Sequence, residues 1–184
     1  MQIVAFDGDE ASTGGTIPIT FLAIELLNTS HRMHSSNTAS GGWASCEMRS
    51  YLANTVLPLI PSNVRARINK ASKTSVWGYP TKHTVITDDY VWIPSRREIA
   101  KDLQHYEQSG IIYDPFQNRL LSEYNKHKAN SETLVAQWLR TSNGDASYSF
   151  CPVASGTAPK PTEELGVWIG FCLGLEPETI TDSW

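Results

Sequence analysis

The residues best suited to bind a metal ion lie near the start of the chain, where Asp7, Asp9 and Glu10 surround Gly8. Carboxylate oxygens around a glycine turn are ligands that calcium prefers. The further donors and the distal glutamate of an EF-hand loop are missing, and neither Cys-x-x-Cys nor His-x-x-x-His occurs. We therefore interpret the segment as an acidic turn that closes a strand and expect no cofactor, with Asp7 and Asp9 kept as the calcium candidates.

Nucleophilic catalysis has equally little support in the sequence. There is no Gly-x-Ser-x-Gly elbow and no glycine-rich phosphate loop. Cys151 and Cys172 lie in apolar strand contexts, where cysteine usually acts as a small buried hydrophobe. Cys46 lies near a predicted helix N-terminus, which lowers a thiol pKa, so it is the best nucleophile candidate of the three. We predict that the chain is not an enzyme.

Three tryptophan motifs stand out: Gly41-Gly42-Trp43, Trp138-Leu139-Arg140 and Gly166-Val167-Trp168. Large rings of this kind usually pack in the core, and a buried arginine usually serves as a hydrogen-bonding strut. We expect Trp43, Trp138 and Trp168 to be structural, with Arg49 and Arg140 in internal ion pairs.

Residues that could meet a ligand are expected in polar or loop contexts. Exposed aromatic rings are predicted at Trp77, Tyr79, Tyr106, Tyr113 and Tyr148. Such rings stack on sugar faces or bury against a protein partner. From these rings and two loops we predict a ligand-binding set: Trp77, Tyr79, Asn143, Asp145, Tyr148, Glu163 and Glu164.

Composition limits the possible partners. The chain has 184 residues and a formal net charge of -4, without a run of Lys or Arg, so a nucleic-acid partner is not expected. No stretch approaches the roughly 20 apolar residues that span a bilayer, and the start lacks the features of a secretory signal. Three widely spaced cysteines argue against a disulfide framework and for folding in a reducing cytoplasm.

The elements needed to hold these residues form an α+β pattern, with helices in the N-terminal half and an antiparallel meander in the C-terminal half. A single domain is expected at 1–173, followed by a tail at 174–184. The expected elements are strands at 2–6 and 17–27, a helix capped by Ser45 and stopped by Pro58 and Pro61, a short helix at 64–68, an exposed strand at 69–75, strands at 84–86 and 90–93 around a turn at 87–89, a helical turn at 96–100 capped by Ser95, a helix near 116–128, and strands at 134–141, 148–153 and 166–173.

Short motifs along nearly the whole chain carry a family resemblance. They are Ile3-Val4-Ala5-Phe6-Asp7, Arg32 to Thr38, Gly41-Gly42-Trp43, Glu47 to Leu52, Leu57-Pro58, Lys70 to Lys73, Trp92-Ile93-Pro94-Ser95 with Glu98, Trp138-Leu139-Arg140, Tyr148-Ser149-Phe150, and Gly166-Val167 to Gly170-Phe171-Cys172. In this order they resemble the bacterial and phage domain-of-unknown-function family 6273.

The resemblance implies a C-type-lectin-like fold, similar to that of phage receptor-binding proteins and sulfatase-modifying enzymes. Such a fold presents variable loops from a compact frame, and here the loops at 143–147 and 155–165 would form the display face. The Glu-Pro-Asn, Gln-Pro-Asp and Trp-Asn-Asp triplets of animal lectins do not occur. The resemblance therefore implies a lectin-like fold without a lectin's metal chemistry.

Three functions remain open. The first is a surface-displayed binding module, on a phage virion (tail, fibre or head decoration) or a bacterial surface, that recognises a host glycan or protein receptor. The second is a structural virion assembly protein, and the third an enzyme related to sulfatase-modifying factors that would use Cys151 and Cys172. For the first we expect cytoplasmic folding, a final place on the virion surface or outside the cell, contacts with other virion or surface proteins, no membrane insertion, and a homo-oligomer.

Overall fold

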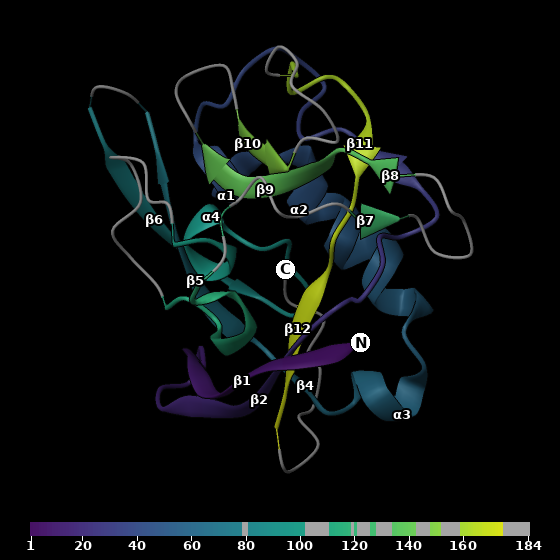
Figure 1. The fold of residues 1–184 in the computed structure, drawn as a ribbon, viewed down its shortest axis with the longest axis vertical. Coiled ribbons are helices and arrows are strands. Elements are labelled where there is room, and N and C mark those ends of the chain that lie inside the picture. The colour runs from purple at the N-terminus through teal and green to yellow at the C-terminus, as the bar shows by residue number, and fades with distance from the viewer. Residues whose placement is uncertain are drawn as a thin grey trace.

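The computed structural model describes residues 1–78, 81–101, 111–118, 120, 126–127, 134–142, 148–151 and 159–174. Within them the chain forms a mixed α+β fold with mostly antiparallel sheets, which confirms the predicted α+β class, and its helices are short. Two four-stranded sheets lie at opposite ends of the molecule, and a two-stranded hairpin rises along one side (Figure 1). None of the described helices is long and apolar enough to cross a membrane.

The lower sheet contains β1 (Gln2–Glu10), β2 (Thr16–Leu22), β12 (Gly170–Leu173) and β4 (Ile68–Asn69), all antiparallel and in the order β1-β2-β12-β4. The prediction that β1 ends before an acidic turn was wrong. The strand continues through Asp7 and Gly8, where a register shift lies between Phe6 and Asp9. Asp7 takes a positive φ of 49° at this irregularity. A bulge of this kind re-aims the side chains that follow it, here Asp9.

The upper sheet contains β10 (Tyr148–Cys151), β9 (Gln137–Ser142), β11 (Leu165–Gly166) and β3 (Ser30–His31). The predicted C-terminal meander was wrong beyond its first pair. β11 pairs with β9 in parallel and with β3 in antiparallel orientation, and β12 leaves for the lower sheet. The two ends of the chain are therefore interleaved in both sheets.

The hairpin contains β5 (Ala71–Trp77) and β6 (His83–Asp89), and a further pair joins β7 (Lys126–His127) to β8 (Leu134–Val135). Two predictions failed here. Residues 87–89 continue β6 rather than forming a turn, and β5 buries Ala71, Lys73 and Ser75 instead of lying exposed. The polar composition of β5 suggested solvent because nothing local reveals that its inner residues meet buried partners.

Helical segments are short: α1 (Gly42–Ser45), α2 (Glu47–Tyr51), the π-helix η1 (Leu52–Val56), the 3-10 helix η2 (Leu57–Leu59), α3 (Ser62–Arg65), α4 (Arg96–Ile99) and the 3-10 helix η3 (Asp114–Phe116). Cys46, not the predicted Ser45, caps α2 by accepting from the Arg49 N–H. Ser95 caps α4 as predicted. The helix predicted near 116–128 falls largely outside the described residues, and Lys126 and His127 belong to a strand.

The core between the sheets is rich in tryptophan. Trp43, Trp92, Trp138 and Trp168 are fully buried. The indole N–H of Trp138 donates to the His31 carbonyl at 3.1 Å, and that of Trp168 donates to the Ala23 carbonyl at 2.7 Å. Two of these rings thus tie N-terminal backbone to the C-terminal part of the chain, and the predicted core role of Trp43, Trp138 and Trp168 is confirmed.

Candidate functional site

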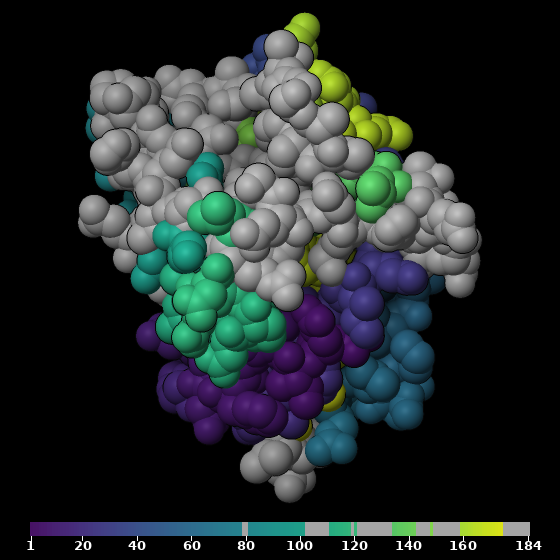
Figure 2. Space-filling view, viewed as in Figure 1, coloured from purple at the N-terminus to yellow at the C-terminus, as the bar shows by residue number. Residues whose placement is uncertain are grey.

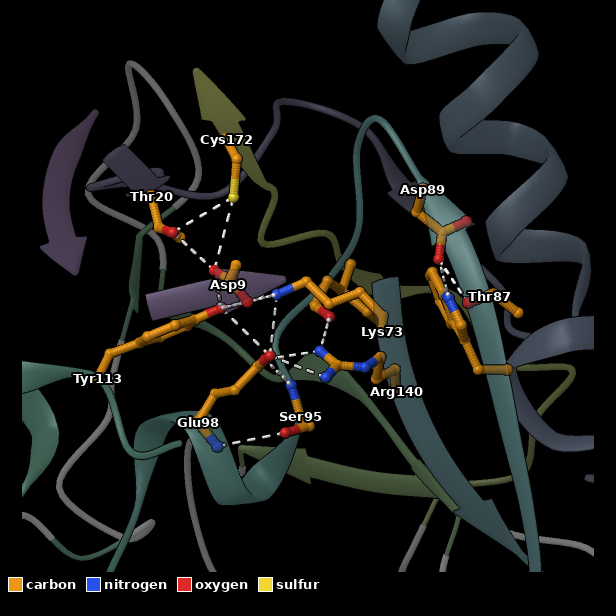
Figure 3. A network of polar contacts seen from close by, with 12 residues as sticks. Asp9, Thr20, Lys73, Thr87, Asp89, Ser95, Glu98, Tyr113, Arg140 and Cys172 are labelled. Carbon is orange, nitrogen blue, oxygen red and sulfur yellow. Dashed lines mark hydrogen bonds and ion pairs between the residues drawn. The ribbon is translucent and has the colours of Figure 1, made fainter. Parts of the chain in front are cut away.

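A set of buried charged and polar side chains lies between the lower sheet and the elements above it, and we call it the buried network: Asp9, Thr20, Lys73, Ser95, Glu98, Tyr113, Arg140 and Cys172 (Figure 3). Lys73 of β5 is at its centre. Its ammonium group pairs with Asp9, donates to Glu98 Oε1 at 3.1 Å, and donates to the Tyr113 hydroxyl at 2.9 Å. The Lys73 side chain is 2% exposed, so water does not screen these contacts.

Glu98 joins this lysine to a second cation. Arg140 Nη1 and Nη2 donate to the two Glu98 carboxylate oxygens at 2.6 and 2.8 Å, the bidentate geometry that a guanidinium favours. The backbone N–H of Ser95 donates to Glu98 Oε2 at 2.8 Å, and the Ser95 hydroxyl accepts from the Glu98 N–H, which completes a capping box on α4. The predicted internal ion pair of Arg140 is confirmed.

Asp9 closes the other side of the network. Its carboxylate accepts from the Thr20 hydroxyl at 2.6 Å and from the Tyr113 hydroxyl at 3.0 Å, in addition to Lys73. Asp7, by contrast, is exposed at the bulge. The structure therefore does not bring the two calcium candidates together, and among the described residues no cluster of three or more His, Cys, Asp or Glu is placed to hold a metal ion.

The pKa shifts of the network follow from burial set against charge pairing. Burial alone would lower the pKa of Lys73, but the Glu98 and Asp9 carboxylates raise it above its ordinary value. Burial alone would raise the pKa of Glu98, but Arg140 and Lys73 hold it well below its ordinary range. Burial, Glu98 and Asp9 raise the pKa of Tyr113. The network thus pairs the side chains of Lys73 and Arg140 with the Asp9 and Glu98 carboxylates, and the Tyr113 phenol lies between them.

A further buried carboxylate, that of Asp89, organises the glycine-tryptophan motif. Its Oδ2 accepts from the Trp43 indole at 2.8 Å and from the Thr87 hydroxyl at 2.7 Å, and its Oδ1 accepts from Arg49 Nε at 2.6 Å. The predicted internal ion pair of Arg49 is thus confirmed. Gly42, at a φ of 57°, leaves room for Trp77, because a Cβ there would lie 2.8 Å from the Trp77 Cβ.

Two tyrosines predicted to be exposed are buried. Tyr148 donates to the Gly42 carbonyl at 2.9 Å and hydrogen-bonds to His34 Nε2 at 2.9 Å, and Tyr113 belongs to the buried network. Both predictions were wrong, because each ring carries a hydroxyl that finds its partners inside the protein. Burial lowers the pKa of His34, against a smaller opposing effect of Glu47.

The other predicted ligand residues lie at the upper end of the molecule where they are described (Figure 1). Trp77 ends β5, is half-buried, and stacks on His83 with ring centroids 4.6 Å apart. Glu163 and Glu164 are exposed just before β11, and Glu163 accepts from the Lys160 N–H at 2.9 Å. Tyr79, Tyr106, Asn143 and Asp145 lie outside the described residues, as do the whole predicted display loop at 143–147 and residues 155–158 of the second.

The cysteines are not activated where the structure describes them. Burial is the largest effect on both thiols, and it raises the pKa of Cys46 to about 12 and that of Cys172 above its ordinary value. The interpretation of Cys46 as the best nucleophile was wrong, because the thiol is buried behind the α2 N-terminus that it caps. The side chain of Cys151 lies outside the described residues.

A separate apolar pocket of about 500 Å³ opens beside the lower sheet. Its walls come from the N-terminus, the segment after β2, the π-helix η1 with η2 and α3, and strand β12. The lining residues are Met1, Leu27, Asn28, Thr29, Tyr51, Val56, Leu59, Ile60, Pro61, Val64, Ile169 and Phe171. Thr29 and Tyr51 hydrogen-bond to each other at 2.8 Å. Local π-helical turns occur frequently at functional sites.

These features define an α+β protein whose polar motif residues stabilise a buried frame. The profile of a family described as a domain of unknown function (DUF6273) matches residues 19–167, and the chain belongs to that family. No curated protein and no solved structure matches the chain. Asp9 and Cys172 of the network lie outside the matched segment, on the strands that flank β2.

Sequence reasoning identified Arg140 and Ser95 but not the centre of the network. Lys73 and Glu98 appeared among the family motifs without a role, and Tyr113 was assigned to the surface. One local signal was available: the Ser95-x-x-Glu98 spacing, typical of a capping box. The pairing of Lys73 with Asp9 joins positions 64 residues apart, and no local pattern predicts it.

Proposed function

We propose that this chain is a non-enzymatic binding module with a C-type-lectin-like fold, displayed on a phage virion or a bacterial surface, where its upper end recognises a glycan or protein receptor. The proposal rests on where the polar residues lie: one group is buried and the other is accessible to a ligand. Three charged residues of the family motifs, Lys73, Glu98 and Arg140, are buried and neutralise one another together with Asp9, while an aromatic ring and two carboxylates remain accessible at the upper end.

Because these motif residues point into the protein, a structural role suits them better than a catalytic one. A general base or nucleophile must reach its substrate, whereas Lys73, Asp9 and Glu98 have side chains at most 8% exposed. Raised thiol pKa values at Cys46 and Cys172 also disfavour the thiol chemistry of sulfatase-modifying relatives of the fold.

The upper end offers chemistry that suits sugar or protein recognition. The Trp77 ring, stacked on His83, presents a fixed aromatic face, and rings of this kind pack on the apolar faces of sugars and on protein side chains. Glu163 and Glu164 add acceptors for sugar hydroxyls or for basic residues. Loops displayed from a rigid scaffold commonly carry binding function.

The test is binding of the labelled protein to a printed array of bacterial polysaccharides, peptidoglycan fragments and envelope proteins. The proposal expects retention on a restricted set of spots, and loss of that retention in Glu163→Gln/Glu164→Gln. Asp7→Asn is the matched control, because it also exchanges an exposed carboxylate for an amide, at the opposite end. Absence of specific retention, or equal loss in both variants, would contradict the proposal.

A further inference from the structure

The face of the lower sheet opposite the buried network is apolar: Phe171 on it is buried at 6% exposure, whereas Ile3 and Phe6 at its β1 edge are 44% and 67% exposed. Thr20 of β2 points inward to Asp9, so its neighbours Ile19 and Phe21 point outward. Residues directly opposite on neighbouring strands share a face. Phe21 pairs with Ile3 and with Phe171, and Ile19 pairs with Phe6 and with Leu173. We call these six residues the outer face: Ile3, Phe6, Ile19, Phe21, Phe171 and Leu173.

The outer face and the apolar pocket form one surface, because Phe171 belongs to both. On that surface Phe6 is 67% exposed and Leu59, at the pocket, is 79% exposed. In the space-filling view the purple N-terminal residues lie directly beside the blue segment that contains α3 (Figure 2). Contiguous exposed apolar surface of this kind marks an interaction site on a soluble protein.

We propose that this surface binds a second copy of the chain in a two-fold symmetric dimer, in which Phe6 of each copy enters the apolar pocket of the other. The surface contains both a protruding ring and a hollow of about 500 Å³. A two-fold contact places the same patch on both copies, so a patch with both shapes is complementary to itself.

The spacing along β1 fits this arrangement. Met1 lines the pocket and Phe6 lies five positions further along, which is roughly 16 Å at the rise of a strand. Ile3 lies about halfway between them. A two-fold axis that passes near Ile3, with the two β1 strands antiparallel, brings each Phe6 over the pocket of the other copy.

Size and charge also fit a second copy. The six outer-face residues and the twelve pocket residues share Phe171 and approach the roughly 20 to 30 residues a side of a stable interface. None of these residues carries a charged side chain, although the chain has a net charge of -4. Apart from the Met1 α-amino group, two copies can meet here without burying like charges. The upper end stays free, so the dimer does not depend on the proposed receptor binding.

The experiment is the native mass in solution, by light scattering, at increasing protein concentration. Wild type should reach twice the monomer mass of 20.4 kDa, whereas Phe6→Lys and Leu59→Lys should stay at the monomer mass. Ile86→Lys is the control, because Ile86 is 65% exposed on β6, away from this surface, and it should remain dimeric. A cooperative urea unfolding transition for each variant shows that it is folded.

Complementation separates the two-fold contact from other assemblies. In a mixture of Phe6→Lys with Leu59→Glu chains, the new lysine of one copy faces the new glutamate of the other, and the second Phe6 meets an unchanged pocket edge on its partner. The mixture should therefore recover the dimer mass. A monomeric wild type, a trimer, or a dimer that Phe6→Lys and Leu59→Lys leave intact would overturn the proposal.

Discussion

The ammonium group of Lys73 lies 3.9 Å from the centroid of the Trp92 ring, at the centre of the buried network. This cation–π contact joins two motifs by which the chain resembles its family, in β5 and in the segment before α4. The same lysine contacts Glu98, which belongs to the same motif as Trp92, and Asp9 of β1. The motif residues thus meet inside the protein, where they connect the lower sheet, the hairpin and α4.

Removing the lysine charge should strongly destabilise the fold. Lys73→Met leaves the Asp9 carboxylate buried without its cation, and breaking one partner of a buried ion pair costs about 3–5 kcal/mol. Urea unfolding measures this loss. The exposed Lys160→Met should change the free energy of unfolding by less than about 0.5 kcal/mol.

Removing the stranded carboxylate should then recover part of the loss. Lys73→Met/Asp9→Asn is expected to unfold at a higher urea concentration than Lys73→Met alone, since the amide carries no charge to desolvate. A double variant that is less stable than Lys73→Met would show that Asp9 is held mainly by Thr20 and Tyr113 and not by the lysine.

The network should give the protein a plateau of stability between acid and strongly alkaline pH. The pKa of Glu98 is lowered on folding, so its contribution is present above the ordinary carboxyl pKa of 4.5 and is lost as pH falls toward the folded value. The pKa of Lys73 is raised above 10.5, so its contribution is lost only when pH rises beyond that value. Urea unfolding from pH 3 to 9 should show a decline confined to the acid side.

The acid decline should become shallower in Glu98→Gln, which is less stable at pH 7 but has no carboxyl to protonate at this position. Equal slopes for wild type and this variant between pH 3 and 5 would show that other carboxyls cause the acid decline.

The described thiols should resist modification in the folded protein. Cys46 and Cys172 are buried and have raised pKa values, so few thiolates form at pH 8. In a Cys151→Ser variant, a disulfide reagent should label almost no thiol in buffer and both cysteines in denaturant. Rapid labelling of either thiol in the folded variant would revive thiol chemistry as a function of this chain.

The glycine-tryptophan motif should tolerate no side chain at Gly42. An added Cβ would lie 2.8 Å from Trp77 at a φ of 57°, whereas at Gly14, with a φ of 90°, nothing lies within 4 Å. Gly14→Ala therefore measures the backbone strain alone, about 1–2 kcal/mol. Gly42→Ala should cost a further 1–3 kcal/mol, roughly, from overpacking. Equal losses would show that Trp77 moves aside freely.

The sequence predicted those parts of the fold that depend on local signals. The Ser95 cap, the buried tryptophans and the internal ion pairs of the arginines follow from residue type and short spacing. Sequence reasoning failed where partners far away along the chain decide whether a side chain is buried. Lys73 appeared exposed because its carboxylate partners come from positions 9 and 98. Tyr148 appeared exposed because its hydroxyl partners, Gly42 and His34, lie more than 100 residues away.

Receptor binding through the upper end is tested most directly by sedimenting labelled protein with intact bacterial cells of several species. Wild type should bind at least one species saturably, and Trp77→Ala should weaken that binding at least tenfold, a loss of about 1.4 kcal/mol. Phe6→Lys, at the opposite end, should bind with the wild-type affinity per chain. Absence of saturable binding to any species, or binding that Trp77→Ala leaves unchanged, would contradict the account.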